Sequence, residues 1–340
     1  MLRSVIGHAK SSFLALANPY QSVEKVFPQI INGFNKGEVK YVGIKNKHQI
    51  PRSLMSNLMR HGYDLHTIDR CSIGGRAVDI NMKNPISGLP MTGSSSGTAV
   101  NVLLGINDLG IGTDGGGSVL APAMSVNLFG FISPLIEKEH VRQFESLSTD
   151  NIPFHVSIGF IAREISILKE AVSIAIPNVS ESSSPTRNLS IITERSATFD
   201  NIEKNSWDIR KEIYPDILGD RQTLIPFLRD NLKGCDMLIS QEGPIDYIGM
   251  GDTLIGHFDE LTKMNQRNSK KGLIRVVNMA NATALVVPKK EFASGYVLIC
   301  ESTPTKISKL FEVAEKISPQ QDGLISRYFQ NIDSYFEQGF

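Results

Sequence analysis

The sequence predicts an α/β protein, built as a single α/β/α domain around a mixed, twisted central β-sheet. Short apolar runs typical of buried strands alternate along the chain with segments whose apolar residues recur at helical spacing. The composition, with 41% hydrophobic and 21% charged residues, is that of an ordinary globular protein. A chain of 340 residues can bury a sizeable core, and a large α/β protein can use this length as one domain.

In the first half of the chain, strand and helix patterns follow one another closely. Residues 39–44 form an apolar run that predicts a strand. Apolar side chains over residues 54–59 mark one face of a helix, and Gly62 is suited to end it. Residues 98–106 are small and apolar and predict a buried helix after a turn. Residues 109–113 predict a buried strand that runs into three glycines.

The second half repeats this alternation. Residues 165–175 form another helical stripe, and residues 307–317, between two prolines, form the clearest amphipathic helix. Three short apolar runs predict buried strands, at residues 237–240, 284–287 and 296–300. Residues 177–188, rich in Ser, Pro and Asn, predict a surface loop. The charged stretch 189–233 predicts a peripheral insertion and not a second domain.

Composition also excludes several classes of function. Lys plus Arg and Asp plus Glu both number 35, so the formal net charge is zero and carries no direct signal for nucleic acid or an anionic membrane. No apolar run approaches the roughly 18–20 residues that a membrane span needs. The three cysteines are widely spaced and suit neither a disulfide framework nor a metal site: Cys71, Cys235 and Cys300. We therefore predict a reducing compartment.

The N-terminal segment has two interpretations. Residues 1–23 carry basic residues and serines but no acidic residue before Glu24, which is similar to a mitochondrial presequence. The alternative is an amphipathic helix that begins the fold. We accordingly divide the chain into residues 1–16, a helix or presequence, and residues 17–340, the main domain. We expect a cytoplasmic protein, with a mitochondrial location as the alternative.

Two segments rich in glycine and serine stand out. Residues 92–98 read Thr-Gly-Ser-Ser-Ser-Gly-Thr, and residues 112–119 read Gly-Thr-Asp-Gly-Gly-Gly-Ser-Val. A flexible linker normally joins polar surroundings, whereas both segments lie within apolar sequence. A phosphate-binding loop is excluded because no lysine follows the glycines at the Walker spacing, and the glycine positions do not fit a dinucleotide fingerprint. Nucleophilic catalysis remains.

Ser118 is the candidate nucleophile. The preceding Gly115, Gly116 and Gly117 allow the backbone to turn sharply and to point several N–H groups at one place, as an oxyanion requires. A serine nucleophile also needs a base. No histidine is placed to complete a Ser-His-Asp triad by sequence order, so the base could be a lysine that acts through a second serine.

Together, the two segments resemble the amidase signature family of amide hydrolases. Its hallmark is a GGSSGG turn followed about two dozen residues later by GTDxGGS, and Ser94 and Ser118 lie 24 residues apart in that order. The family's catalytic lysine ends a strand of the type PVGVKD, which residues 41–46 match with Lys45 in the lysine position. Further similarities extend the resemblance over residues 17–317.

The resemblance implies a hydrolase of carboxamide C–N bonds outside peptides, with a Ser-cisSer-Lys triad, an acyl-enzyme and no cofactor. Ser118 would attack the amide of a small-molecule substrate, Ser94 would relay the proton, and a neutral Lys45 would be the base. The peptide bond between Gly93 and Ser94 would be cis. Lys47, two residues beyond Lys45, competes for the role of base.

The same resemblance assigns other roles around the two serines. The backbone N–H groups of residues 115–118 would hold the oxyanion. Ser95 and Thr113 would supply supporting hydroxyls. Asp114 is expected to stabilise the turn and not to take part in catalysis.

The chain departs from the family pattern in ways that leave the substrate open. It is shorter than a typical member, Ser96 replaces a glycine of the first turn, and Leu120 replaces an arginine that usually follows the nucleophile. The alternative function that the resemblance implies is the glutaminase subunit of a glutamyl-tRNA(Gln) amidotransferase, which the replaced arginine and the shorter chain disfavour. A homodimer or a complex with amidotransferase subunits is the expected association. An inactive scaffold is disfavoured because Lys45, Ser94 and Ser118 are all present.

Overall fold

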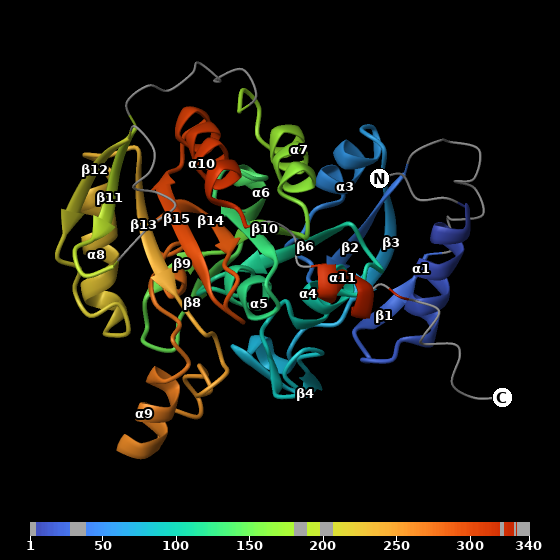
Figure 1. Cartoon of the computed structure of the whole chain (residues 1–340), viewed down its shortest axis with the longest axis horizontal. Coiled ribbons are helices and arrows are strands. Elements are labelled where there is room, and N and C mark those ends of the chain that lie inside the picture. Colours follow the sequence, from blue (N-terminus) through green and yellow to red (C-terminus); the bar gives the residue numbers. More distant parts are fainter. Residues whose placement is uncertain are drawn as a thin grey trace.

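The structure is a computed structural model that describes residues 5–27, 39–179, 189–197, 207–319, 323–329 and 331. Within these residues, eleven strands form one large sheet: β1 (Val23–Val26), β2 (Lys40–Lys45), β3 (Tyr63–Asp69), β6 (Leu109–Asp114), β7 (Phe129–Ser133), β10 (Ser157–Ala162), β11 (Ser190–Glu194), β12 (Asp208–Glu212), β13 (Met237–Glu242), β14 (Ala282–Pro288) and β15 (Gly295–Glu301). Their order is β1-β3-β2-β6-β10-β7-β14-β15-β13-β11-β12 (Figure 1). The predicted strands are therefore present. The strand predicted at residues 39–44 is shifted by one residue, and the other four are longer than predicted.

The sheet is mixed. β3, β2 and β6 run parallel to one another, as do β13, β11 and β12. The strands between these two groups pair antiparallel.

Helices cover both faces of the sheet (Figure 1). One face carries α4 (Ser96–Leu103), α5 (Leu120–Ser125) and α8 (Arg221–Leu232). The opposite face carries α3 (Arg52–Met59), α7 (Ile165–Ala175) and α10 (Pro304–Ile317). The apolar sides of these helices pack into two clusters of buried side chains, one on each face. The predicted α/β/α fold with a mixed central sheet is confirmed.

Smaller elements surround this core. Outside the main sheet, β4 (Val78–Lys83) pairs with β5 (Pro90–Thr92), and β8 (Glu145–Leu147) pairs with β9 (Pro153–His155). The remaining helices of the described chain are α1 (Val5–Ala17), α6 (Lys138–Val141), α9 (Glu260–Arg267) and α11 (Gly323–Phe329). In Figure 1, α9 projects from the body of the molecule. None of the helices described here is long and apolar enough to cross a membrane.

Helix α1 packs against the main domain. Leu14 is buried in the core, and the Ser12 hydroxyl lies 3.0 Å from Nε2 of His66 on β3. The segment thus has the helical conformation that one of the two interpretations predicted. The presequence alternative and the boundary at residue 17 stay predictions.

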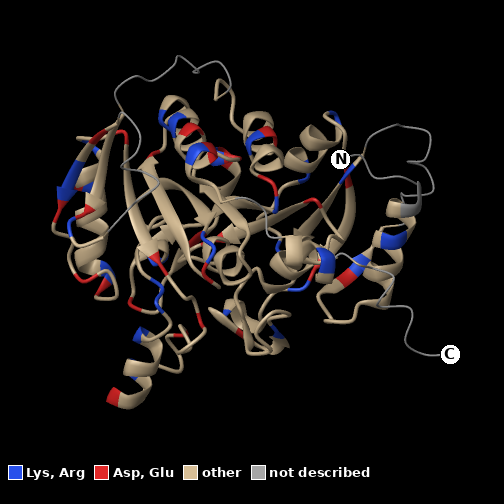
Figure 2. Cartoon of the chain, in the orientation of Figure 1, with Lys and Arg blue, Asp and Glu red and all other residues tan. Residues whose placement is uncertain are grey.

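The described residues of the segment, 189–197 and 207–233, are part of the sheet and its core, and the prediction of a peripheral insertion is wrong. The segment contains β11, β12 and α8, and α8 buries Leu224 and Leu228 in the core. The error has a physical cause. β12 is an edge strand with one neighbour, so its side chains are largely solvent-exposed and charged, and its sequence lacks the apolar pattern of a buried strand. Figure 2 shows charges of both signs along this edge and on the outer helices. Of the predicted loop 177–188, residues 180–188 lie outside the described residues.

The parallel pairing of β2 and β6 brings the carboxyl ends of these two strands together. Val42 lies opposite Leu109, and Ile44 lies opposite Ile111. Carboxyl ends of parallel neighbours emerge at the same edge of a sheet. Lys45, the last residue of β2, therefore lies beside the end of β6, where the chain continues into the glycines that precede Ser118.

Candidate active site

Lys45 lies in direct contact with Ser94. Its side chain is 1% exposed, and Nζ donates a hydrogen bond of 2.8 Å to the Ser94 Oγ. The same ammonium donates to the carbonyl oxygen of Thr113 at 3.0 Å and to the Thr113 hydroxyl at 3.2 Å. No carboxylate forms an ion pair with Lys45 within the described residues.

Ser94 occupies a tight turn between β5 and α4. The peptide bond between Gly93 and Ser94 is cis. Gly93 N–H donates to the Ala77 carbonyl at 2.9 Å, and the Ser94 carbonyl accepts from Ser72 N–H at 3.1 Å. A Cβ atom at Gly93 would lie 2.3 Å from the Arg76 carbonyl oxygen, so only glycine fits there.

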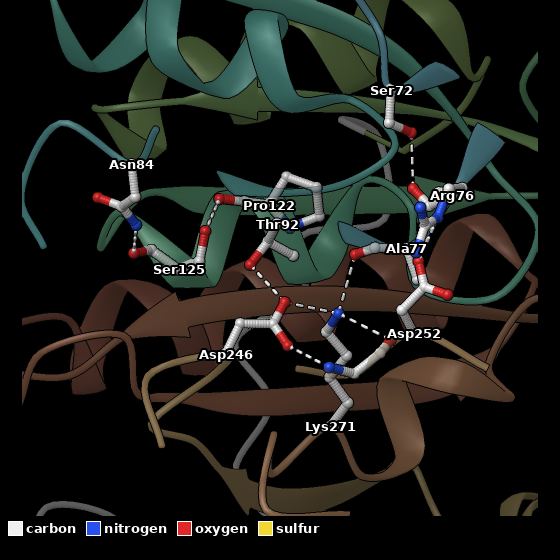
Figure 3. Close-up of polar contacts among 11 residues, drawn as sticks. Ser72, Arg76, Ala77, Asn84, Thr92, Pro122, Ser125, Asp246, Asp252 and Lys271 are labelled. Carbon is white, nitrogen blue, oxygen red and sulfur yellow. Dashed lines mark hydrogen bonds and ion pairs between the residues drawn. The ribbon is translucent and has the colours of Figure 1, made fainter. Parts of the chain in front are cut away.

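A buried ion pair supports this turn through Thr92 and Ala77 (Figure 3). Lys271 Nζ lies 2.6 Å from Asp246 Oδ2, and the two side chains are 5% and 3% exposed. Asp246 accepts a hydrogen bond of 2.7 Å from the hydroxyl of Thr92, and Lys271 donates one of 3.0 Å to the Ala77 carbonyl. The ion pair therefore holds Thr92, which precedes Gly93, and Ala77, whose carbonyl accepts the N–H of Gly93.

The second turn joins β6 to α5 and carries Ser118. The Asp114 carboxylate accepts N–H bonds from Gly117 at 2.7 Å and from Val119 at 2.6 Å, which stabilises the turn as expected. Gly117 has a φ of +96°, a conformation that a side chain would strain. The Ser118 carbonyl accepts a hydrogen bond of 3.1 Å from Ser95 N–H, so the two serine turns are joined directly.

The predicted oxyanion donors divide into two groups. Gly117 N–H is occupied by Asp114, so the predicted donor role does not extend to Gly117. The N–H groups of Gly115, Gly116 and Ser118 make no hydrogen bond within the described chain. Sequence spacing could not reveal this difference, because it depends on which amides the Asp114 side chain reaches after folding.

The two predicted supporting hydroxyls also differ. Thr113 contacts Lys45 through both its carbonyl and its hydroxyl. The Ser95 hydroxyl is fully buried and has no partner among the described residues. Ser95 therefore contributes through its backbone N–H.

Several solved structures share this fold. An allophanate hydrolase from Kluyveromyces lactis is 14% identical, with a TM-score of 0.65, and the match covers 92% of this chain and 69% of that one. A bacterial aryl acylamidase of the amidase signature enzymes is 13% identical, with a TM-score of 0.63 and coverages of 96% and 94%. One of the subunits of the glutamyl-tRNA(Gln) amidotransferase from Thermotoga maritima is 15% identical, with a TM-score of 0.62 and coverages of 94% and 94%.

Sequence comparison adds a family match. Residues 82–203, which include both serine segments, match the family described as Amidase. Over these residues the chain is similar to that family. The predicted resemblance to the amidase signature family is thus confirmed over residues 82–203, and the solved structures confirm the predicted fold. The predicted class, an amidase-type enzyme acting on carbon–nitrogen bonds, agrees with this match. A search of the curated proteins found no match.

Burial sets the electrostatics of this candidate site. Desolvation lowers the pKa of Lys45 from 10.5 to about 8, because a charged ammonium is unfavourable away from water. The neighbouring Cys71 and Asp114 oppose that change, and Lys47 adds to it. Burial raises the pKa of Asp114, against the effect of the N–H groups that it accepts. Lys47 is partly exposed and makes no hydrogen bond with either serine within the described chain.

Three residues that lie near the two serine turns were not predicted as part of the site: Asn278, Arg221 and Arg275. Asn278 donates to the carbonyls of Gly115 at 3.3 Å and His155 at 2.8 Å, and so holds the first glycine of the nucleophile turn. It lies within residues 17–317, over which the family resemblance extends. Arg221 and Arg275 also approach this turn, and no feature of the sequence marks them. The described residues contain no group of His, Cys, Asp or Glu side chains that could hold a metal ion.

Proposed function

We propose that the chain hydrolyses a carboxamide C–N bond through an acyl-enzyme on Ser118, with Ser94 as proton relay and Lys45 as base. The observation that carries this proposal is the 2.8 Å contact between Ser94 Oγ and the buried amine of Lys45. A lysine at the end of a strand normally extends into water. One that is buried against a serine and lacks a carboxylate partner is suited to proton transfer.

The contacts of Lys45 fit the neutral amine. A neutral amine has two N–H donors and one lone pair. In that state the carbonyl and hydroxyl oxygens of Thr113 accept the two N–H bonds. The lone pair then accepts the proton of the Ser94 hydroxyl, in place of the N–H bond that the ammonium donates to Ser94 Oγ. Thr113 is thus a positioning residue for the base.

The first half of the reaction forms the acyl-enzyme. The Ser118 hydroxyl transfers its proton to Ser94 as Ser94 transfers its own to Lys45, and Ser118 Oγ attacks the amide carbon. The N–H groups of Gly115, Gly116 and Ser118 receive the negative oxygen of the tetrahedral intermediate, where one such donor is typically worth about 2.7–4 kcal/mol. The C–N bond then breaks, and the proton returns through Ser94 to the leaving amine.

The second half releases the acid. Water attacks the ester on Ser118 and gives its proton to Lys45 through Ser94. The tetrahedral intermediate collapses, the acid leaves, and Ser118 recovers its proton.

The test is labelling with a fluorophosphonate probe, followed by a screen of primary and secondary amides. We expect the wild-type protein to be labelled on Ser118, as located by peptide mass spectrometry, and Ser118→Ala to resist the probe. Labelling at another serine, or no labelling of an intact folded protein, would contradict the proposal.

The amidotransferase alternative needs a different experiment. The Thermotoga maritima protein and the aryl acylamidase match the chain with TM-scores of 0.62 and 0.63, so similarity of fold does not separate the two functions. Copurification of the tagged chain with other subunits would favour the amidotransferase role, whereas an isolated homodimer or monomer with amidase activity would favour the proposed one. The cytoplasmic and mitochondrial locations stay predictions.

A further inference from the structure

One segment of the chain contacts both serine turns. We call this segment, residues 271–278, the strap. At its beginning, Lys271 donates a hydrogen bond of 3.0 Å to the carbonyl of Ala77, which also accepts an N–H bond from the first turn. At its end, Asn278 donates one of 3.3 Å to the carbonyl of Gly115 in the second turn. A displacement of the strap would therefore disturb the surroundings of both serines.

The middle of the strap packs against the second turn. Residues 273–275 form a short 3₁₀ helix. A Cβ atom at Gly117 would lie 3.2 Å from the carbonyl oxygen of Ile274, and one at Gly116 would lie 3.5 Å from that of Arg275. The backbone of the strap thus forms a wall along the glycines that precede the nucleophile.

Glu242 holds the strap at Gly272, the residue before this short helix. Glu242 is the last residue of β13, and its side chain is buried, with 3% of its surface exposed. Gly272 N–H donates a hydrogen bond of 2.7 Å to Oε2 of Glu242. A Cβ atom at Gly272 would lie 2.8 Å from the carboxyl carbon of Glu242, so the bond depends on the absence of a side chain there.

The carboxyl of Glu242 contributes little to stability apart from this bond. Among the described residues, no basic side chain forms an ion pair with it, and its Oε1 has no hydrogen-bond partner. Burial raises the pKa of Glu242 from 4.5 to about 7, against the effects of Gly272 N–H and of the positive charge of Arg275. A buried oxygen without a partner costs free energy. The bond to Gly272 is thus the specific contribution of this side chain.

We propose that Glu242 is a positioning residue for catalysis, which fixes the strap by accepting Gly272 N–H and thereby holds the second turn in its reactive geometry. This inference rests on amide hydrolysis at Ser118, the proposed function. Glu242 makes no hydrogen bond to either serine within the described chain, so it acts through the strap.

This role should affect kcat more than KM. The glycine N–H groups receive negative charge only after Ser118 attacks, so their placement stabilises the transition state and not the bound substrate. A misplacement of about 1 Å in an active site can reduce the rate about 100-fold. A residue needed only for folding would instead change the melting temperature.

The test replaces Glu242 with glutamine and with methionine. Glutamine keeps an oxygen that can accept Gly272 N–H, whereas methionine is unbranched and has no such acceptor. The control is Ile239→Ala, because Ile239 is buried on the face of the sheet opposite the apolar residues of the strap. For each protein, kcat and KM on one amide, the rate of fluorophosphonate labelling and Tm are measured.

We expect Glu242→Met to reduce kcat by about 10- to 100-fold with little change in KM, and to slow labelling of Ser118 by a similar factor. Its Tm should fall less than that of Ile239→Ala, which loses core packing but should keep the wild-type kcat. Glu242→Gln should also keep most of the wild-type kcat. An unchanged kcat in Glu242→Met, or an equal loss in Glu242→Gln, overturns the inference.

A second variant breaks the same bond from the other side. The Cβ atom of Gly272→Ala would force the Glu242 carboxyl away from the N–H group. If Glu242→Met does not fold, Gly272→Ala should show the same loss of kcat with little change in KM. A wild-type kcat in Gly272→Ala then overturns the inference.

Hydrogen exchange separates this inference from the proposed function. The N–H groups of Gly117 and Val119 are bonded to Asp114, so their exchange reports on the second turn without any turnover. A protein that the probe labels at Ser118 but whose kcat does not depend on Glu242 keeps the proposed function and loses the role of the strap. A protein that is not labelled loses the proposed function, and exchange alone then decides. Faster exchange of residues 112–119 in Glu242→Met, but not in Ile239→Ala, supports the inference, and unchanged exchange overturns it.

Discussion

The pH dependence of activity follows directly from the burial of Lys45. Its amine must be neutral to take a proton, and burial lowers its pKa from 10.5 to about 8. A base that works in its neutral form gains activity as pH rises through its pKa. Activity should therefore rise about tenfold per pH unit between pH 6 and 7, and it should level off above pH 8.

The shift in pKa sets the size of the effect. With a pKa of about 8, roughly one Lys45 side chain in ten is neutral at pH 7. With the ordinary value of 10.5, about one in 3,000 would be neutral. Burial thus raises the fraction of competent base about 300-fold at pH 7, and an exposed lysine could not replace it.

The assay measures kcat/KM for one amide and one activated ester from pH 6 to 10. Lys45→Arg should lose about 10²–10⁴-fold on the amide, because a guanidinium does not deprotonate at these pH values. Lys45→Ala should be equally poor on the amide but less affected on the ester, whose leaving group needs no proton. Lys47→Arg is the matched control two residues away and should keep the wild-type profile.

Three results would refute this reasoning. A flat profile between pH 6 and 8 would mean that Lys45 is not the titrating base. Near-normal amide hydrolysis by Lys45→Arg would make the residue structural. An ester-to-amide ratio that is equal in wild type and Lys45→Ala would remove Lys45 from protonation of the leaving amine, and Lys47 or a histidine would then have to be tested.

Three further predictions address the nucleophile and the stability of the site. Ser118→Ala should reduce amide turnover below about one-thousandth of wild type, measured as product by mass spectrometry, and higher residual turnover would place the nucleophile elsewhere. Lys45→Met should stabilise the fold at pH 7 by up to about 3 kcal/mol in urea titrations, since the folded pKa of Lys45, about 8, lies below its ordinary 10.5. Between these two pKa values the folded wild type binds fewer protons than the unfolded chain, so the stability of the wild type rises from pH 8 to 10.5. The extra stability of Lys45→Met over the wild type should therefore shrink over that range. A difference in stability that does not change with pH would contradict this prediction. Lys271→Met should destabilise the fold by about 3–5 kcal/mol, because Asp246 keeps a buried charge, and the Lys271→Met, Asp246→Asn double variant should recover much of the loss.

The sequence by itself determined the resemblance to the amidase signature family, most of the core elements and the three residues proposed for catalysis. The reason is local. The glycines and serines of residues 92–98 and 112–119 favour tight turns whatever surrounds them. Apolar periodicity likewise marks the buried strands and helices from the local sequence alone. Lys45 could be proposed because it ends a strand of recognisable pattern.

Tertiary structure alone decided which distant residues complete the site. Asp246 and Lys271 support the Ser94 turn from more than 150 residues away, as the Thr92–Asp246 bond shows, and Arg221 reaches Gly116 from a helix whose sequence indicated only a charged, peripheral segment. The engagement of Gly117 N–H by Asp114 likewise depends on side-chain geometry within the folded turn. Charge and hydrogen-bonding capacity are visible in a sequence, but whether they are exposed, paired or aimed at a reacting atom is set by packing between segments that no local pattern connects.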